Sequence, residues 1–349
     1  MTTMNSIVES PVDDLTAMTA EKLKTSKSAI LLFGTFTEAV TELLRIFYKP
    51  QSLLVGAGHV TPEIEIAADR AEIELVEALA ASPFSSDVEG ILPAIRSPHD
   101  LIYVANPNRV TGANYTIADL ERLARAVPHG ALIIDEHYYD YFGISGFPLL
   151  DILTNLVIVR SFTTGDGPNS SDAGFILGNP DTMKIIKDSS RIKSLPSSTG
   201  RTILSTLVND EILATQLREL HEEALRVAST LTRLGVQCRI TPADFLLLRV
   251  ASPKNVGDFL VRYNSPVDNL DGYPQLKSYL RYTVQSVNGN ERLLEAFKKM
   301  PEEYYQMRTA DGRAVTINRP ANIARAGNKR FRQKSGSRPG TLARQPTRS

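Results

Sequence analysis

Short apolar runs alternate with longer segments of helical period along most of the chain from Ala29 onward. Strands buried in a parallel sheet are apolar on both faces, whereas the helices that connect them carry one apolar stripe. The alternation therefore predicts an α/β fold in which crossover helices cover a mostly parallel sheet. The runs expected to form its strands are 29–33, 52–56, 73–78, 100–105, 131–136 and 155–160.

Capping residues mark where several of the intervening helices should start. Thr37 can cap a helix over 38–47, and Thr116 precedes a periodic segment over 117–127. Asn179 is followed by a proline, which is favoured at the first position of a helix. These signals predict three helix starts.

The pattern changes after the sixth strand. The apolar run 173–178 follows 155–160 after a loop too short for a crossover helix, so we expect these two strands to be antiparallel. Helical periodicity then runs almost unbroken over 199–234. A compact α+β unit should follow, with strands at 236–240, 245–251 and 280–284 and a helix at 254–263.

These changes divide the chain into four parts. We expect a short N-terminal arm over 1–28, a large α/β domain over 29–210, a small α+β domain over 211–308 and a tail over 309–349. The tail has few large apolar residues and repeated Gly, Pro, Ser and Arg. The tail has too little apolar surface for its burial to offset the entropy cost of ordering the chain, so we expect the tail to be disordered.

Charge is balanced over the whole chain but not along it. The 349 residues carry 39 basic and 39 acidic side chains, yet residues 312–349 contain ten basic and no acidic ones. The rest of the chain is therefore at 29 − 39 = −10. The composition favours a solubilising or merely tolerated extension over a dedicated nucleic-acid arm, and an acidic or nucleic-acid partner for the tail is the alternative.

Cysteine and histidine usage excludes several classes of site. The single Cys238 rules out an intrachain disulfide framework and a multi-thiolate metal site. No two of the five histidines have the i, i+4 spacing of helical metal ligands, so no metal is expected. The sequence shows no secretory leader and no apolar run long enough to span a membrane, and we expect a cytoplasmic protein without a membrane partner.

Four segments, in this order, resemble fold-type I pyridoxal-phosphate (PLP) aminotransferases, and most closely their histidinol-phosphate aminotransferase branch. The resemblance implies a PLP-transferase fold of type I, with a large and a smaller C-terminal domain, and a homodimer. The segments are FGTFTEAVTELL (33–44), ANPNRVTG (105–112), LIIDEHYYDYF (132–142) and LRYTVQSVNGNERLLEAF (280–297).

The resemblance assigns roles to individual residues. It makes Asp135 the partner of the cofactor's pyridine nitrogen, Tyr138 the donor to its phenolic oxygen, and Arg281 the clamp on a substrate carboxylate. Gly34 and Thr35 would hold the cofactor phosphate at a helix N-terminus. The alternatives are a strand-end cap for Asp135, packing for Tyr138 and a surface ion pair for Arg281.

Several residues that the family's chemistry needs are missing. An ungapped alignment puts Thr164 at the position of the lysine that holds the cofactor, and no lysine occurs between Lys49 and Lys184. A hydroxyl cannot form the Schiff base. The same alignment puts Asp172 in place of an arginine that pairs with the phosphate, and Arg109 in place of an asparagine. We therefore expect no cofactor, with PLP as the cofactor if the ancestral site still binds one.

Three functions fit these observations. The first is a pseudoenzyme, an aminotransferase-like protein with a binding, assembly or regulatory role, whose pocket could hold a small anionic ligand between Arg281 and Arg109. The second is an active PLP-dependent aminotransferase, a transferase acting on a small amino acid through a non-standard lysine. The third is a PLP-independent enzyme with His137 as general base, against packing of that side chain as the alternative.

Overall fold

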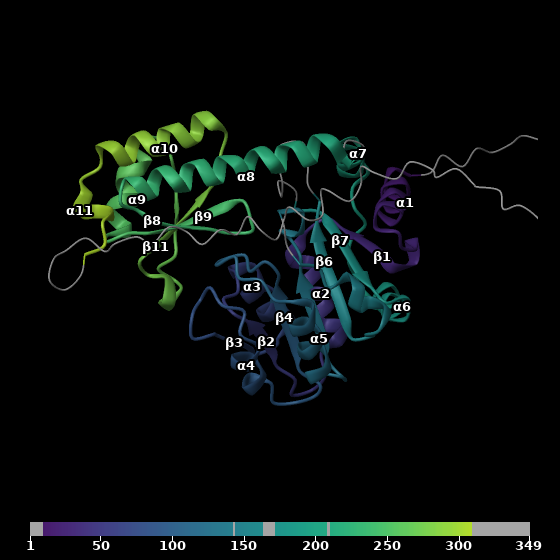
Figure 1. Cartoon of the computed structure of the whole chain (residues 1–349). Coiled ribbons are helices and arrows are strands. Elements are labelled where there is room, and N and C mark those ends of the chain that lie inside the picture. Colours follow the sequence, from purple (N-terminus) through teal and green to yellow (C-terminus); the bar gives the residue numbers. More distant parts are fainter. Residues whose placement is uncertain (1–9, 142–143, 163–171, 208–209, 309–349) are drawn as a thin grey trace, which may run out of the picture. The chain divides into compact units, whose positions relative to one another are not determined.

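The structure, a computed structural model, describes residues 10–141, 144–162, 172–207 and 210–308 (Figure 1). All of these residues belong to one compact unit, Met1–Ile317. Thr164 and the basic tail lie outside the described residues, so the predictions made for them remain predictions. No helix in the described ranges is both long and apolar enough to cross a membrane.

A seven-stranded sheet forms the first part of the fold, in the order β1-β7-β6-β5-β4-β2-β3. Neighbouring strands from β3 to β6 are parallel, and β7 is antiparallel to β6, as predicted. Strand β7 is also antiparallel to β1, a pairing that the sequence did not indicate. The central strands are buried along their whole length, which explains their continuous apolar runs. The strands are β1 (Ile30–Phe33), β2 (Leu54–Ala57), β3 (Leu75–Ala78), β4 (Leu101–Ala105), β5 (Ala131–Asp135), β6 (Leu156–Ser161) and β7 (Gly174–Gly178).

Side chains of successive residues on these strands enter two different apolar clusters. On β4, Ile102 and Val104 join one cluster, whereas Leu101 and Tyr103 join the other. Helices on both faces complete these clusters, as expected for crossover connections. The helices of this part are α1 (Pro11–Leu23), α2 (Phe36–Phe47), α3 (Pro62–Ala71), α4 (Val88–Ile91), α5 (Ile117–Ala126), α6 (Pro180–Ser189) and α7 (Ser197–Leu207).

Two of the three predicted helix starts are confirmed. Thr116 and Asp119 form a reciprocal capping box at α5, and the Asn179 side chain accepts from the amide of Asp181 at α6. The prediction for Thr37 is wrong, because α2 begins at Phe36. Phe36 is only 3% exposed, and burial of its ring fixes its backbone in the first helical turn.

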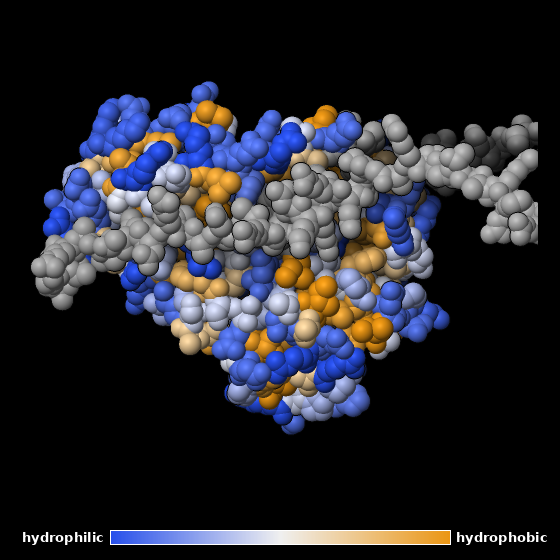
Figure 2. Space-filling model, in the orientation of Figure 1, coloured by the Kyte–Doolittle hydropathy of each residue, from blue (hydrophilic) through white to orange (hydrophobic). Residues whose placement is uncertain are grey.

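A second, antiparallel sheet has the order β10-β11-β9-β8. Helices α8, α9 and α10 pack on one of its faces and share an apolar cluster with Leu246 and Leu248 of β9. In Figure 2, hydrophilic side chains gather over α10, away from this cluster. The elements are α8 (Asp210–Arg233), β8 (Gln237–Ile240), β9 (Phe245–Arg249), α9 (Pro253–Val261), β10 (Asp268–Asn269), β11 (Tyr279–Thr283), α10 (Val287–Lys299) and α11 (Glu302–Tyr305).

The other face of this small sheet points toward the large one. Phe245 and Leu247 alternate with the helix-facing residues of β9 and join a cluster with Val110 and Tyr138. Arg281 of β11 pairs in register with Leu247. The period of two along a strand therefore puts Arg281 on the face that meets the large sheet.

Candidate functional site

The carboxyl ends of the central parallel strands bring several predicted residues to one edge of the sheet. Asp135 is the last residue of β5, Ser161 is the last residue of β6, and the turn that carries Arg109 follows β4. In open α/β sheets, ligands bind outside this edge. The edge is therefore the candidate site.

Asp135 is fully buried, and both of its carboxylate oxygens have partners. The Tyr103 hydroxyl donates to Oδ2 at 2.6 Å, and the backbone N–H of His137 donates to Oδ1 at 2.9 Å. Burial raises the pKa of Asp135, while the nearby Arg109 opposes that rise. Sequence reasoning missed Tyr103, although a hydroxyl within an all-apolar strand signals a buried hydrogen bond.

Arg109 lies directly beside this carboxylate. Its Nη1 is 3.6 Å from Oδ2 of Asp135, and its guanidinium carbon is 4.9 Å from the centre of the Phe36 ring. Burial opposes its charge, but Asp135 more than compensates and raises the pKa of Arg109 above its ordinary value. Arg109 is therefore a fixed cation at the edge of the sheet.

The N-terminus of α2, which carries the predicted residues Gly34 and Thr35, already holds an anion. Oδ1 of Asp172 accepts from the backbone N–H of Phe36 at 3.1 Å. Thr35 is the N-cap residue, but its side chain makes no capping hydrogen bond. The Asp172 carboxylate caps the helix instead.

Arg281 and Tyr138 meet at the same site from the two sheets. Nη2 of Arg281 donates to the Tyr138 hydroxyl at 2.7 Å, and it lies 3.9 Å from Oδ1 of Asp244. The Arg281 guanidinium carbon also lies 4.2 Å from the centre of the Phe245 ring. Burial and the Asp244 carboxylate raise the pKa of Tyr138, so its hydroxyl stays protonated.

His137 is close to the site but is poorly suited to accept a proton. Its Nδ1 lies 2.9 Å from the hydroxyl oxygen of Ser161. Burial, with added repulsion from Arg109 and Arg281, lowers the pKa of His137 well below its ordinary value. A general base works best when its pKa is near the working pH. This environment does not favour His137 as a base at neutral pH.

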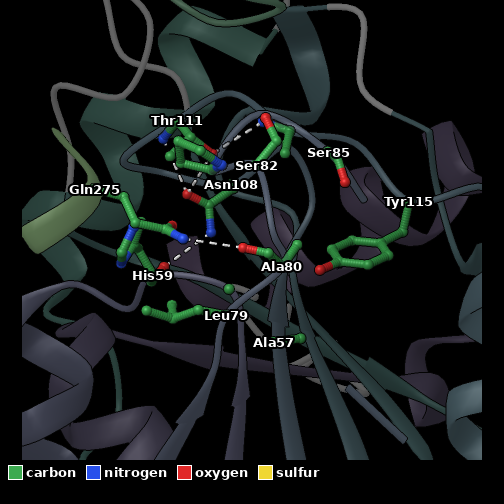
Figure 3. Close-up of a pocket in the computed structure, with 13 residues that line it drawn as sticks. Ala57, His59, Leu79, Ala80, Ser82, Ser85, Asn108, Thr111, Tyr115 and Gln275 are labelled. Carbon is green, nitrogen blue, oxygen red and sulfur yellow. Dashed lines mark hydrogen bonds between the residues drawn. The ribbon is translucent and has the colours of Figure 1, made fainter. Parts of the chain in front are cut away.

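A small cavity opens beside the site, at the carboxyl ends of β2 and β3 (Figure 3). Its volume is about 10 Å³, which is room for one water molecule. Both ring nitrogens of the buried His59 and Oε1 of Gln275 border it without a hydrogen-bond partner. One water molecule there could bond Oε1 of Gln275 and one ring nitrogen of His59, but not both ring nitrogens, because these point in different directions.

No group of three or more potential metal ligands occurs among residues 10–141, 144–162, 172–207 and 210–308.

The family model described as aminotransferase class I and II matches residues 3–297. The chain belongs to this family. The match runs from the N-terminal region through both sheets and the Arg281 strand, and it confirms the predicted superfamily.

Relatives of this aminotransferase-family chain support the predicted branch. Histidinol-phosphate aminotransferase 1 of Burkholderia lata is 30% identical over 240 residues, which are 67% of this chain and 66% of that protein. The protein of the same name from Carboxydothermus hydrogenoformans is 28% identical over 231 residues, 64% of each chain. The chain thus spans slightly less than two thirds of the length of these relatives.

Solved structures of the family share the fold at lower identity. Histidinol-phosphate aminotransferase from Sinorhizobium meliloti, in complex with pyridoxal-5'-phosphate, has a TM-score of 0.73 and 17% identity, with 83% of each chain covered. L-threonine-O-3-phosphate decarboxylase from Porphyromonas gingivalis has a TM-score of 0.68 and 21% identity, over 83% of this chain and 89% of that one. The predicted PLP-transferase fold of type I is confirmed. The two names describe different reactions, so the fold alone does not fix an activity.

Proposed function

We propose that this chain is an aminotransferase-like pseudoenzyme that works by binding rather than by transamination. The observation that carries the proposal is the contact between Arg109 and Asp135. The carboxylate that the resemblance gives to the cofactor's pyridine nitrogen faces a cation of the chain itself at 3.6 Å. The residues present therefore do not fit PLP.

The available lysines support this proposal. Strand β7 is antiparallel to β6, so α6 starts at the edge of the sheet opposite Asp135. Lys184 and Lys187 of α6 are exposed, and Nζ of Lys187 donates to the Ser28 carbonyl ahead of β1. Lys193, in the following loop, is also exposed. An active aminotransferase would need one of these lysines, or another, to reach the pocket.

The proposal predicts that the native protein forms no internal aldimine with PLP. Purified full-length chain should show no stoichiometric absorbance to the red of the protein band after addition of PLP. Borohydride reduction followed by peptide mass mapping should find no single modified lysine, because Lys184, Lys187 and Lys193 are exposed rather than held in the pocket. The variant Lys193→Ala is the control, since it removes the loop lysine. A stoichiometric adduct on the native chain that is lost in this variant would show that Lys193 binds PLP covalently. That result would contradict the proposed function.

The ligand class follows from the donors that remain open at the site. Nη1 of Arg109 and Nε of Arg281 are buried without a hydrogen-bond acceptor. Burial raises the pKa of Glu63, but hydrogen bonds, with added attraction from Arg109 and Arg281, lower it below its ordinary value. Asp244 also lies beside Arg281, so part of the positive charge is already balanced. We propose a small monocarboxylate, which adds one negative charge and two acceptor oxygens.

Calorimetric titration with acetate and with pyruvate tests the ligand class. The native chain should bind one of them, and Arg281→Gln should weaken that binding by about tenfold or more, because a charge-assisted hydrogen bond is lost. Arg226→Gln is the matched control, since Arg226 bonds Glu223 and Glu291 on the small domain's helices instead. Equal affinities of the native chain and Arg281→Gln would exclude this ligand site.

The expected homodimer and the expected cytoplasmic location of the protein remain predictions.

A further inference from the structure

We infer that Arg109 and Asp172 are the residues that exclude the family's cofactor, because they stand in for its two charged ends. The guanidinium of Arg109 takes the place of the pyridine ring's cationic nitrogen, and the carboxylate of Asp172 takes the place of the phosphate. This assignment rests on the proposed function but goes further. It states that the exclusion comes from two side chains, apart from the missing lysine.

The carboxylate of Asp172 has the geometry of a bound anion. Its Oδ1 lies 3.1 Å from the backbone nitrogen of Phe36, which is the first residue of α2. A helix N-terminus offers free N–H groups and positive potential to one anion. A phosphate at the same place would lose this donor and would also meet a like charge. Asp172 therefore competes with phosphate by position and by charge.

Arg109 closes the other end of the site in the same way. It brings a planar cation to within 3.6 Å of the buried carboxylate of Asp135, with the Tyr103 hydroxyl on the same oxygen. A ring nitrogen could approach Asp135 only after this guanidinium had moved. The asparagine that the family has at this position is shorter and uncharged, so it would leave the carboxylate accessible.

A single residue links the two contacts. The backbone N–H of Phe36 binds Asp172, and the ring of Phe36 lies against the guanidinium of Arg109 at 4.9 Å. Phe36 thus contacts the anion through its backbone and the cation through its ring. Both stand-ins are held by the scaffold rather than by each other, so each should contribute separately to exclusion.

The test uses the full chain and the variants Arg109→Asn, Asp172→Asn and their combination. Asp172→Asn keeps an oxygen that can accept from Phe36 but removes the charge, so the helix cap persists. Binding of inorganic phosphate is followed by thermal unfolding, and binding of PLP by calorimetry. The native chain should respond to neither probe. Asp172→Asn should be stabilised by phosphate, and the double variant should bind PLP at least tenfold more tightly than the native chain does.

The matched control is Asp119→Asn, which changes a carboxylate at the start of α5, in the capping box with Thr116. Phosphate should not stabilise this variant. Equal stabilisation of Asp119→Asn and Asp172→Asn would overturn the inference, and so would a folded double variant that binds no PLP. If the double variant fails to fold, the thermal stability of Asp172→Asn in phosphate tests the inference instead. No stabilisation of that variant by phosphate would then overturn the inference. Covalent PLP on the native chain would instead overturn the proposed function, so the two failures are distinguishable.

Discussion

Replacement of Arg160 by Met should lower the free energy of unfolding by about 3–5 kcal/mol, because it leaves a buried carboxylate without its counter-charge. Nε of Arg160 donates to Oε2 of Glu136 at 2.8 Å, and Nη2 donates to the Ser145 hydroxyl at 2.8 Å. The Glu136 side chain is fully buried, and burial raises its pKa while Arg160 opposes that rise. Urea denaturation at neutral pH measures the loss.

A second ion pair serves as the control for this prediction. Arg122 and Glu89 approach to 2.7 Å, but their side chains are 50% and 72% exposed. Arg122→Met should therefore cost far less stability than Arg160→Met does, because water and salt screen an exposed pair. Removing both charges with Glu136→Gln in the Arg160→Met background should recover part of the loss. Similar costs for the two arginine variants would contradict the burial argument.

Gly174→Ala should cost about 3 kcal/mol or more, because a methyl group has no room in β7. A Cβ atom at Gly174 would lie 2.0 Å from the carbonyl oxygen of Arg160 and 2.6 Å from the ring of Phe33. The carbonyl belongs to the backbone of β6 and cannot move without breaking the pairing of β6 with β7. Equilibrium denaturation of the variant and the native chain measures the difference in the free energy of unfolding.

Gly272→Ala is the natural comparison, since nothing lies within 4 Å of a Cβ placed there. Its stability should stay within about 0.5 kcal/mol of the native value. If Gly174→Ala were equally mild, β7 would have to sit less tightly between its neighbours than the structure shows. The position of Asp172 depends on this strand, which starts two residues after it.

The strands of the large sheet could be predicted from sequence because burial on both faces leaves an apolar run that is visible locally. The antiparallel direction of β7 could also be predicted, because the loop before it is too short to hold a crossover helix. The start of α2 could not, because it depends on where the ring of Phe36 packs. A local cap signal at Thr37 carries no information about that tertiary contact.

The site was predictable only residue by residue. The sequence predicts Asp135, Tyr138 and Arg281 because their neighbours resemble a known family, and the structure brings Tyr138 and Arg281 into contact. The contacts that decide what the site can hold join residues far apart in the chain. Asp172 and Phe36 are 136 positions apart, and no pattern in either segment reveals that one caps the helix of the other.

The two contacts of Phe36, with Asp172 and with Arg109, also bear on how the site could change by successive mutations. A mutation that placed a lysine at position 164 alone would leave Asp172 at the start of α2 and Arg109 beside Asp135. It would therefore not by itself restore binding of the cofactor. A substitution of Asp172 or Arg109 alone would remove a stabilising contact and so lower the stability of the protein, without restoring catalysis. Under the proposed function, each single substitution toward the family's residues therefore loses stability before any catalysis is gained. Under the proposed function, the start of α2 therefore disfavours a stepwise return to transamination, because no single substitution there both keeps stability and restores the cofactor site.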